Sequence, residues 1–271
     1  MFLRISFPSL ARLMLILGLL TSPTIAADHL PKSAEILEID DHRGFLYRAP
    51  TPAPGQPWVW FAPTIRGMSI ALRRVYFESW LRAGISIAGY DLGEVRGAPA
   101  STQQFTSFYQ SMVDRGFSPK PILLGQSRGG LMLLSWAVAN PQRVRAFVGI
   151  YPVCNLTSWP LKNSKTTTLA DFAMAENELL ADLPRYNPID KLQGLLANQV
   201  PMFIVHGDSD SSVPYSENSE ILKERYAAGG GVIQVKLIAG EGHKASASFF
   251  ECRELLDFVN DVGRTEGRSK R

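Results

Sequence analysis

The most constraining feature of this sequence is a serine set among glycines, at the point where a short apolar run gives way to a helical pattern. The apolar run covers residues 122–125, and Ser127 follows in the order Gly-Gln-Ser-Arg-Gly-Gly. A serine on a sharp strand-to-helix turn needs neighbours without a Cβ two places before and after it, because a larger residue would collide with the adjoining chain. Gly125 and Gly129 meet that need, and Gly130 adds room where the helix begins. The pattern predicts an exposed, nucleophilic serine, and the alternative is a purely structural tight turn.

Strands alternate with helices along most of the remaining chain. Period-2 and apolar runs predict strands at residues 34–40, 44–48, 58–61, 85–90, 122–125, 145–151, 201–205 and 232–238. Helical spacing and capping patterns predict helices at residues 71–83, 101–115, 131–138, 169–183, 216–227 and 245–262, with Ser101 as the cap of the second. This alternation predicts an α/β fold, a mainly parallel sheet with helices on both faces. Residues 28–271 then form one domain, and the strand-free stretch 153–185 is expected to be a small cap insertion.

The first 27 residues have the pattern of a cleavable signal peptide. Arg4 and Arg12 precede the apolar run 13–20, and small residues follow it, with expected cleavage after Ala26 or Ala27. The run is too short for a membrane span of about 20 residues. The expectation is therefore a secreted or periplasmic protein that has no membrane span after cleavage.

Charge and cysteine content narrow the expected partners. Removing the two arginines of the signal peptide from 28 basic side chains leaves 26, against 25 acidic ones, so no nucleic-acid partner is expected. Cys154 and Cys252 are the only cysteines. In an exported chain they could form one disulfide, and the alternative is two buried free thiols. No metal-ligand spacing is present, so neither a metal nor another cofactor is expected.

A nucleophilic serine needs a base, and the chain has four histidines. His243 follows the last expected strand within Ala-Gly-Glu-Gly-His, where a loop residue at the carboxyl end of a strand can reach across the sheet. His206, at the end of another strand, is the rival. The acid that orients the base is expected between the serine and the histidine in the chain, and both Asp208 and Asp210 fit that order.

The segment His206-Gly-Asp-Ser-Asp-Ser-Ser-Val-Pro214 resembles the His-Gly-x-x-Asp-x-x-Val-Pro motif of α/β-hydrolases. Together with Gly-x-Ser-x-Gly-Gly, it is most similar to the esterase, dienelactone-hydrolase and prolyl-oligopeptidase catalytic-domain branch. The resemblance implies an α/β-hydrolase fold, a catalytic Ser127–His243–Asp210 triad and a structural His206. One departure is the pair Ala62-Pro63, which replaces the His-Gly pair common after the third strand of the family.

An acyl-transfer site also needs N–H groups for the developing oxyanion. The backbone N–H of Arg128, directly after the serine, is the first expected donor. Pro63 has no N–H, so Thr64 is the second expected donor, with Ile65 next.

These residues predict a serine hydrolase, most specifically a carboxylesterase that forms an acyl-enzyme on a small-molecule ester. A peptidase of the prolyl-oligopeptidase type acting on short peptides is the alternative. A binding protein that keeps only the fold is a third reading.

Overall fold

The computed structural model describes residues 34–64 and 73–264, and the expected signal peptide lies outside them. Among the described residues, no helix is long and apolar enough to cross a membrane. The core is an eight-stranded sheet in the order β1-β2-β4-β3-β5-β6-β7-β8. The strands are β1 (Glu35–Ile39), β2 (His42–Tyr47), β3 (Trp58–Ala62), β4 (Ser86–Asp91), β5 (Ile122–Gln126), β6 (Ala146–Ile150), β7 (Met202–Gly207) and β8 (Ile233–Ile238). β2 pairs in antiparallel fashion with β1 on one side and with β4 on the other, and all pairs from β4 to β8 are parallel.

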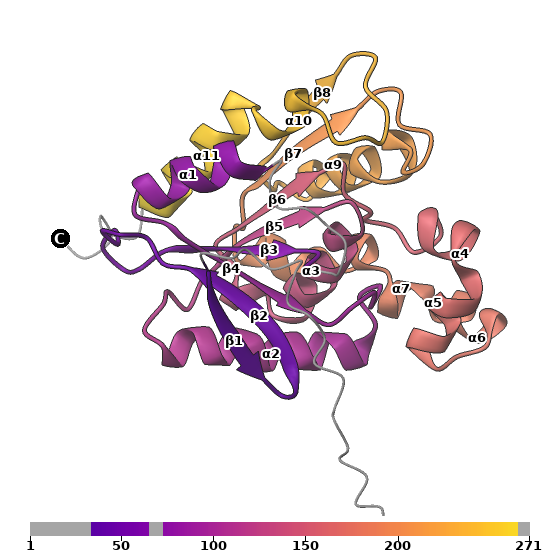
Figure 1. The fold of residues 1–271 in the computed structure, drawn as a ribbon. Coiled ribbons are helices and arrows are strands. Elements are labelled where there is room, and N and C mark those ends of the chain that lie inside the picture. The colour runs from indigo at the N-terminus through magenta and orange to yellow at the C-terminus, as the bar shows by residue number, and fades with distance from the viewer. Residues whose placement is uncertain (1–33, 65–72, 265–271) are drawn as a thin grey trace, which may run out of the picture.

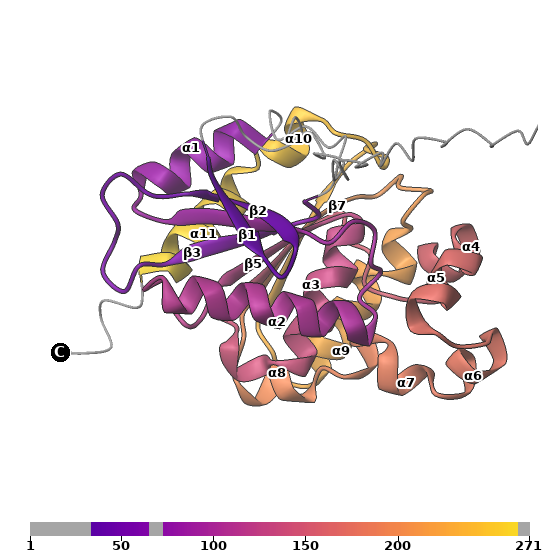
Figure 2. The ribbon, with the colours of Figure 1, turned by 60° about the horizontal axis from the view of Figure 1, so that its bottom comes forward.

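Helices cover both faces of this sheet, as Figures 1 and 2 show. The helices are α1 (Arg74–Arg82), α2 (Pro99–Asp114), α3 (Arg128–Ala139), α4 (Trp159–Asn163), α5 (Lys165–Phe172), α6 (Glu176–Ala181), α7 (Leu183–Tyr186), α8 (Gln193–Ala197), α9 (Ser219–Ala228), α10 (Ala247–Phe250) and α11 (Arg253–Arg264). One apolar cluster lies between the sheet and α2, α3, α8 and α9, and another lies between the opposite face and α1, α10 and α11. The predicted α/β fold is confirmed.

The helix layers on both faces of the sheet explain why the central strands are mostly apolar. Every residue of β3, β5, β6 and β7 is buried, because side chains on both faces of a parallel strand meet a helix layer. β8, at the edge of the sheet, is only partly buried. β5 is therefore packed on both faces, and this packing fixes the position of the serine that follows it.

The helices α4 to α7 lie at the carboxyl end of the sheet, beside the main body (Figure 1). They occupy most of the stretch in which a cap insertion is expected, but as four short helices rather than one at 169–183. A third apolar cluster holds them to α3 and to the loop after β7 through Leu131, Phe172, Leu179 and Val213.

Two predicted helix boundaries are wrong. α2 begins at Pro99 with Ala98 as the capping residue, because proline is favoured at the first helical position. The hydroxyl of Ser101 donates to the Ala98 carbonyl instead of capping the helix. The final helix is divided into α10 and α11, and between them the Cys252 N–H donates to the hydroxyl of Tyr76 at 2.9 Å.

The possible Cys154–Cys252 disulfide is not formed, and the structure supports the alternative of two buried free thiols. Both cysteines are buried free thiols. Cys154 packs in the cluster on the α2–α3 face of the sheet, and Cys252 packs in the cluster on the α1–α11 face. The sheet therefore separates the two sulfur atoms.

Candidate active site

Ser127 stands on the sharp turn between β5 and α3. Its backbone adopts φ 49° and ψ −121°, a conformation that a non-glycine residue keeps only where its surroundings impose it. Its N–H donates to the Ile150 carbonyl at 3.0 Å, and its carbonyl accepts from Val153 at 2.8 Å and Gly130 at 2.9 Å. These bonds tie the turn to the end of β6 and hold the serine side chain clear of the sheet.

The three glycines around the serine are required for packing. A Cβ on Gly125 would lie 2.6 Å from the Cα of Gly130, and one on Gly129 would lie 2.1 Å from the Ala62 carbonyl oxygen. A Cβ on Gly130 would lie 2.4 Å from the Cβ of Pro152. A side chain at any of these three positions would therefore clash, as the sequence pattern predicts.

The structure brings Ser127, His243 and Asp210 together. The Oγ of Ser127 lies 2.8 Å from Nε2 of His243, and Nδ1 of His243 lies 2.7 Å from Oδ2 of Asp210. His243 follows β8 and Asp210 follows β7, so loops at the carboxyl ends of neighbouring strands supply both partners. Because the carboxylate only accepts, Nδ1 of His243 carries a proton, and Nε2 of the neutral ring is free to accept the serine proton.

Asp210 is held as a carboxylate by several donors. Burial raises the pKa of Asp210, but hydrogen bonds from His206, His243 and the Val213 N–H outweigh that effect and hold the pKa well below its usual value. Oδ1 accepts from the N–H groups of Ser212 at 3.0 Å and Val213 at 2.8 Å. The side chain has no exposed surface. Asp210 is therefore a fixed negative charge behind the imidazole.

His206, the rival base, is fully buried behind Asp210. Its Nδ1 lies 2.7 Å from the Ser219 hydroxyl, and its Nε2 lies 2.9 Å from the Val213 carbonyl and 3.4 Å from Oδ2 of Asp210. A carbonyl can only accept, so Nε2 carries the proton. His206 thus braces the loop that carries Asp210, and it lies away from Ser127.

Asp208, the alternative acid, accepts hydrogen bonds from two other groups. Its Oδ1 accepts from the Gly240 N–H at 2.8 Å and from the Ser209 hydroxyl at 2.8 Å. It therefore ties the loop after β7 to the loop after β8, and its contacts do not include His243.

The two expected oxyanion donors come from different segments, Arg128 from the start of α3 and Thr64 from the end of β3. Arg128 is the first residue of α3, and N–H groups of the first helical turn have no partner within the helix. Thr64 is buried just beyond β3, with its hydroxyl donating to the Phe61 carbonyl at 3.3 Å. The preceding residues Ala62 and Pro63 pack directly against Gly129. Ile65 lies outside the described residues, and the role of Thr64 stays a prediction.

The side chain of Arg128 forms an ion pair with Glu94, in the loop between β4 and α2. Its guanidinium also lies 5.9 Å from the ring centre of Trp159 in α4. Next to it, Arg96 binds the Asp171 carboxylate of α5 at 2.7 Å. These charges join three segments at the edge of the site, so the Arg128 side chain is already engaged by the protein.

Sequence reasoning did not reveal that Tyr151 contacts the histidine, or which residues hold Tyr151 in place. The rings of Tyr151 and His243 meet edge to face, with centroids 4.7 Å apart. The amide of Gln126 donates to the Tyr151 hydroxyl at 2.6 Å, and the guanidinium of Arg73 donates to the amide oxygen at 2.8 Å. The adjacency of Gln126 to Ser127 was the only signal in the sequence, because Arg73 and Tyr151 approach it only in the folded chain.

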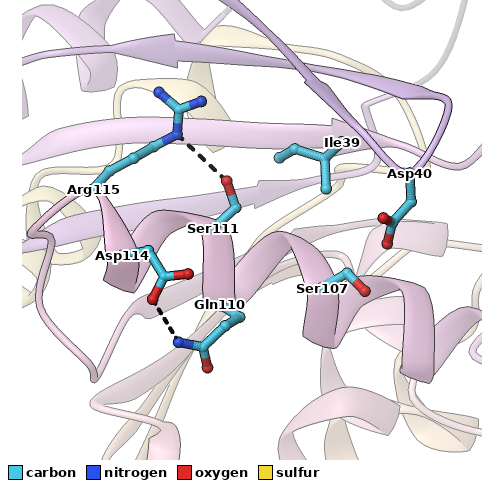
Figure 3. A pocket seen from close by; sticks show the side chains of 7 residues that line it. All are labelled: Ile39, Asp40, Ser107, Gln110, Ser111, Asp114 and Arg115. Carbon is cyan, nitrogen blue, oxygen red and sulfur yellow. Dashed lines mark hydrogen bonds between the residues drawn. The ribbon is translucent and has the colours of Figure 1, made fainter.

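The described surface also has an open hollow between β1 and the second half of α2 (Figure 3). Its lining is largely polar and includes Asp40, Asp114 and Arg115, and none of the Ser127 group contributes to it. In the part of the chain that the structure describes, no cluster of His, Cys, Asp and Glu side chains could hold a metal ion.

A mainly parallel sheet with such a serine between β5 and α3 defines the α/β-hydrolase superfamily. Residues 100–264 match the prolyl oligopeptidase family, which is more than half of the chain. The chain therefore belongs to the prolyl oligopeptidase family, within the serine hydrolases of α/β-hydrolase fold.

Three individual proteins that resemble the chain share 26% sequence identity or less with it. Acyl-protein thioesterase 1 of Kluyveromyces lactis is 26% identical over 170 residues, which are 62% of this chain and 61% of that protein. A puromycin-hydrolyzing peptidase of Mycobacterium tuberculosis superposes with a TM-score of 0.65 at 17% identity, over 85% of this chain and 40% of that one. An esterase/lipase from an uncultured bacterium gives 0.60 at 20% identity, over 90% and 86%. The two structures share the fold, and the chain spans less than two thirds of the thioesterase and of the peptidase.

Proposed function

We propose that this protein is a carboxylic-ester hydrolase that works through an acyl-enzyme on Ser127. The observation that carries the proposal is the continuous path from Ser127 Oγ to His243 Nε2 at 2.8 Å and from His243 Nδ1 to Asp210 Oδ2 at 2.7 Å. Both distances fall within the range over which a proton passes between heavy atoms. The buried carboxylate of Asp210 stabilises the imidazolium that forms when the proton moves.

In the acylation half of the reaction, Nε2 of His243 takes the proton of Ser127, and the serine oxygen attacks the carbonyl carbon of the ester. The N–H groups of Arg128 and Thr64 donate to the oxygen that becomes negative. His243 then returns the proton to the alcohol oxygen, the bond from carbon to that oxygen breaks, and the alcohol leaves.

Deacylation repeats these steps with water as the nucleophile. His243 takes a proton from water, the hydroxide attacks the acyl carbon, and the proton passes to the Ser127 oxygen as its bond to carbon breaks. The acid leaves and the serine is restored. Every proton in the cycle moves through Nε2 of His243. The oxyanion donors stabilise the negative charge on the substrate oxygen, and Asp210 stabilises the positive charge on the imidazolium.

Hydrolysis of short peptides is the second candidate, and the match to the prolyl oligopeptidase family favours it. The chemistry is the same, but an amine leaves instead of an alcohol. The ion pair between Arg128 and Glu94 beside Trp159 lies at the edge of the site and favours neither substrate class. The thioesterase relative adds thioesters to the classes that an experiment should include.

A substrate panel separates these candidates. Purified protein is assayed on p-nitrophenyl acetate and butyrate, on an acyl thioester and on aminoacyl-anilides, each beside the Ser127→Ala variant. We expect the esters to give the highest kcat/KM and the variant to lose at least about three orders of magnitude on every substrate cleaved. Faster cleavage of the anilides would favour the peptidase, and equal rates for both proteins would refute the mechanism.

We also propose that the protein is exported, with residues 1–27 removed as a signal peptide. The support is the sequence pattern of Arg4, Arg12 and the apolar run that follows them. N-terminal sequencing of the exported protein is expected to begin at Ala27 or Asp28. An intact N-terminus on protein that stays inside the cell would contradict export.

A further inference from the structure

One side of the His243 imidazole packs against the ring of Tyr151, which takes no part in the proton path. This ring is the aromatic wall of the site. His243 lies in the loop between β8 and α10, and its side chain is 21% exposed. The hydrogen bond from Nδ1 to Asp210 holds one side of the ring, but a rotation about the side-chain torsions of His243 would still move Nε2 away from Ser127. The edge-to-face contact with Tyr151, with centroids 4.7 Å apart, restricts that rotation.

Tyr151 is itself held in place from below. The guanidinium of Arg73 can only donate, so the amide atom of Gln126 that faces it is the oxygen. The amide nitrogen of Gln126 consequently faces Tyr151 and donates to its hydroxyl at 2.6 Å. Arg73 in turn lies between the rings of Phe61 and Phe250, 5.1 and 5.3 Å from their centres. The amide therefore has one orientation, and the tyrosine hydroxyl has a fixed donor.

The backbone and the neighbouring rings hold Tyr151 as well. Its φ of 36° lies in the left-handed region, which a tyrosine adopts only where its surroundings require it. The ring of Phe249 packs edge to face against it, with centroids 4.8 Å apart. Burial raises the pKa of the Tyr151 hydroxyl to about 12, so the group stays neutral at ordinary pH and supplies no proton to the site.

We propose that Tyr151, fixed by Gln126 and Arg73, is a positioning residue that keeps the His243 imidazole aligned between Asp210 and Ser127. The proposal rests on the proposed function, because alignment matters only if His243 carries the proton. The aromatic ring of Tyr151 is the group that restricts the rotation of the imidazole. The hydroxyl serves to hold that ring through Gln126.

Two substitutions at this position separate the ring from the hydroxyl. Tyr151→Phe keeps the wall and removes the acceptor of the Gln126 amide, and we expect its kcat to stay within about fivefold of the wild-type value. Tyr151→Leu removes the wall, and we expect kcat to fall about 30- to 100-fold, as misplacement of a reacting group by about 1 Å does. KM should change less than about threefold, because binding precedes the proton transfer.

The matched control is Phe258→Leu, a partly buried residue that packs against the same apolar cluster and contacts Phe203. It loses a ring from the same face of the sheet without touching the site, so kcat should be unchanged. Equal losses in the leucine variants at 151 and 258, or equal losses in the phenylalanine and leucine variants at 151, would overturn the proposal. If Tyr151→Leu does not fold, Tyr151→Met, which fills more of the volume, replaces it with the same expectation.

A spectroscopic readout separates this proposal from the proposed function. The proton between His243 Nδ1 and Asp210 is followed by low-field proton NMR of histidine-labelled protein. We expect a resolved signal in the wild type and in Tyr151→Phe, and a broadened or lost signal in Tyr151→Leu. An unchanged signal in the leucine variant refutes the positioning role. A wild type that shows the signal but cleaves no substrate refutes the proposed function alone.

Discussion

The imidazole Nε2 of His243 lies 2.8 Å from the hydroxyl oxygen of Ser127, although 116 positions separate them in the chain. The order of the strands explains how they meet. β5, β6, β7 and β8 are consecutive parallel neighbours, and Ser127, Tyr151, Asp210 and His243 follow them in that order. The loop after β8 reaches back over the ends of β7 and β6, so that acid, base, aromatic wall and serine line up along one edge of the sheet.

Asp210→Asn tests the role of the acid. An asparagine keeps the size of the side chain but removes the charge that stabilises the imidazolium, and it can hold the wrong tautomer of His243. We expect kcat on p-nitrophenyl butyrate to fall by about three to four orders of magnitude.

Asp208→Asn is the matched control for that experiment. Its carboxylate accepts from Gly240 and Ser209, and its contacts do not include the imidazole, so we expect less than about a tenfold loss. The assignment of Asp210 would fail if the two variants lost activity equally, or if Asp208→Asn lost more.

The same carboxylate predicts how stability depends on pH. The folded-state pKa of Asp210 lies below its ordinary value, so the carboxylate stabilises the folded state above the unfolded-state pKa of about 3.9. That contribution is lost as the pH falls below this value toward the folded-state pKa. Wild type should exceed Asp210→Asn in free energy of unfolding by about 1–3 kcal/mol at pH 6. Urea denaturation should show the difference shrinking between pH 4 and pH 3, and a constant difference would contradict the linkage.

Gly129→Ala tests the steric basis of the turn. Its Cβ would meet the Ala62 carbonyl oxygen at 2.1 Å, and because the atoms that it meets belong to the backbone they cannot move aside easily. We expect a loss of about 3 kcal/mol in the free energy of unfolding. Gly242→Ala is the control, since the nearest atom to its added Cβ, the Ser209 carbonyl oxygen, lies 3.6 Å away. Similar urea midpoints for the two variants would contradict this reading.

The fold could be predicted because local rules dominate in the central strands. β3 and β6 are apolar throughout, β5 is apolar up to its last residue, Gln126, and the glycines around Ser127 have a steric reason that the sequence displays directly. The sequence also places Asp210 and His243 on loops after strands, where the structure has them.

Most of what the sequence did not reveal depends on contacts between distant residues, and the start of α2 is the exception. The start of α2 at Pro99 follows from local proline geometry, which the serine pattern at Ser101 obscured. The contribution of Arg73 and Tyr151 depends on two elements meeting at Gln126, and no local pattern encodes that meeting. Cys154 and Cys252 pack on opposite faces of the sheet, and their positions in the sequence do not show which face each one occupies.

The thiols give a simple chemical check of the fold. Cys154 and Cys252 are both buried, and burial raises the pKa of each thiol, so few thiolates are available to react. We expect slow reaction with Ellman's reagent in the folded protein and two free thiols after unfolding in urea. No free thiol in unfolded, unreduced protein would show that the cysteines are bridged.

Covalent labelling of the serine tests the central claim most directly. Protein treated with a fluorophosphonate is digested and analysed by peptide mass spectrometry, with residual esterase activity measured in parallel. We predict one adduct per chain, on Ser127, with loss of activity in proportion to labelling, and a His243→Ala variant that labels at least about a thousandfold more slowly. Full ester hydrolysis by protein that carries no adduct on Ser127 would contradict the account.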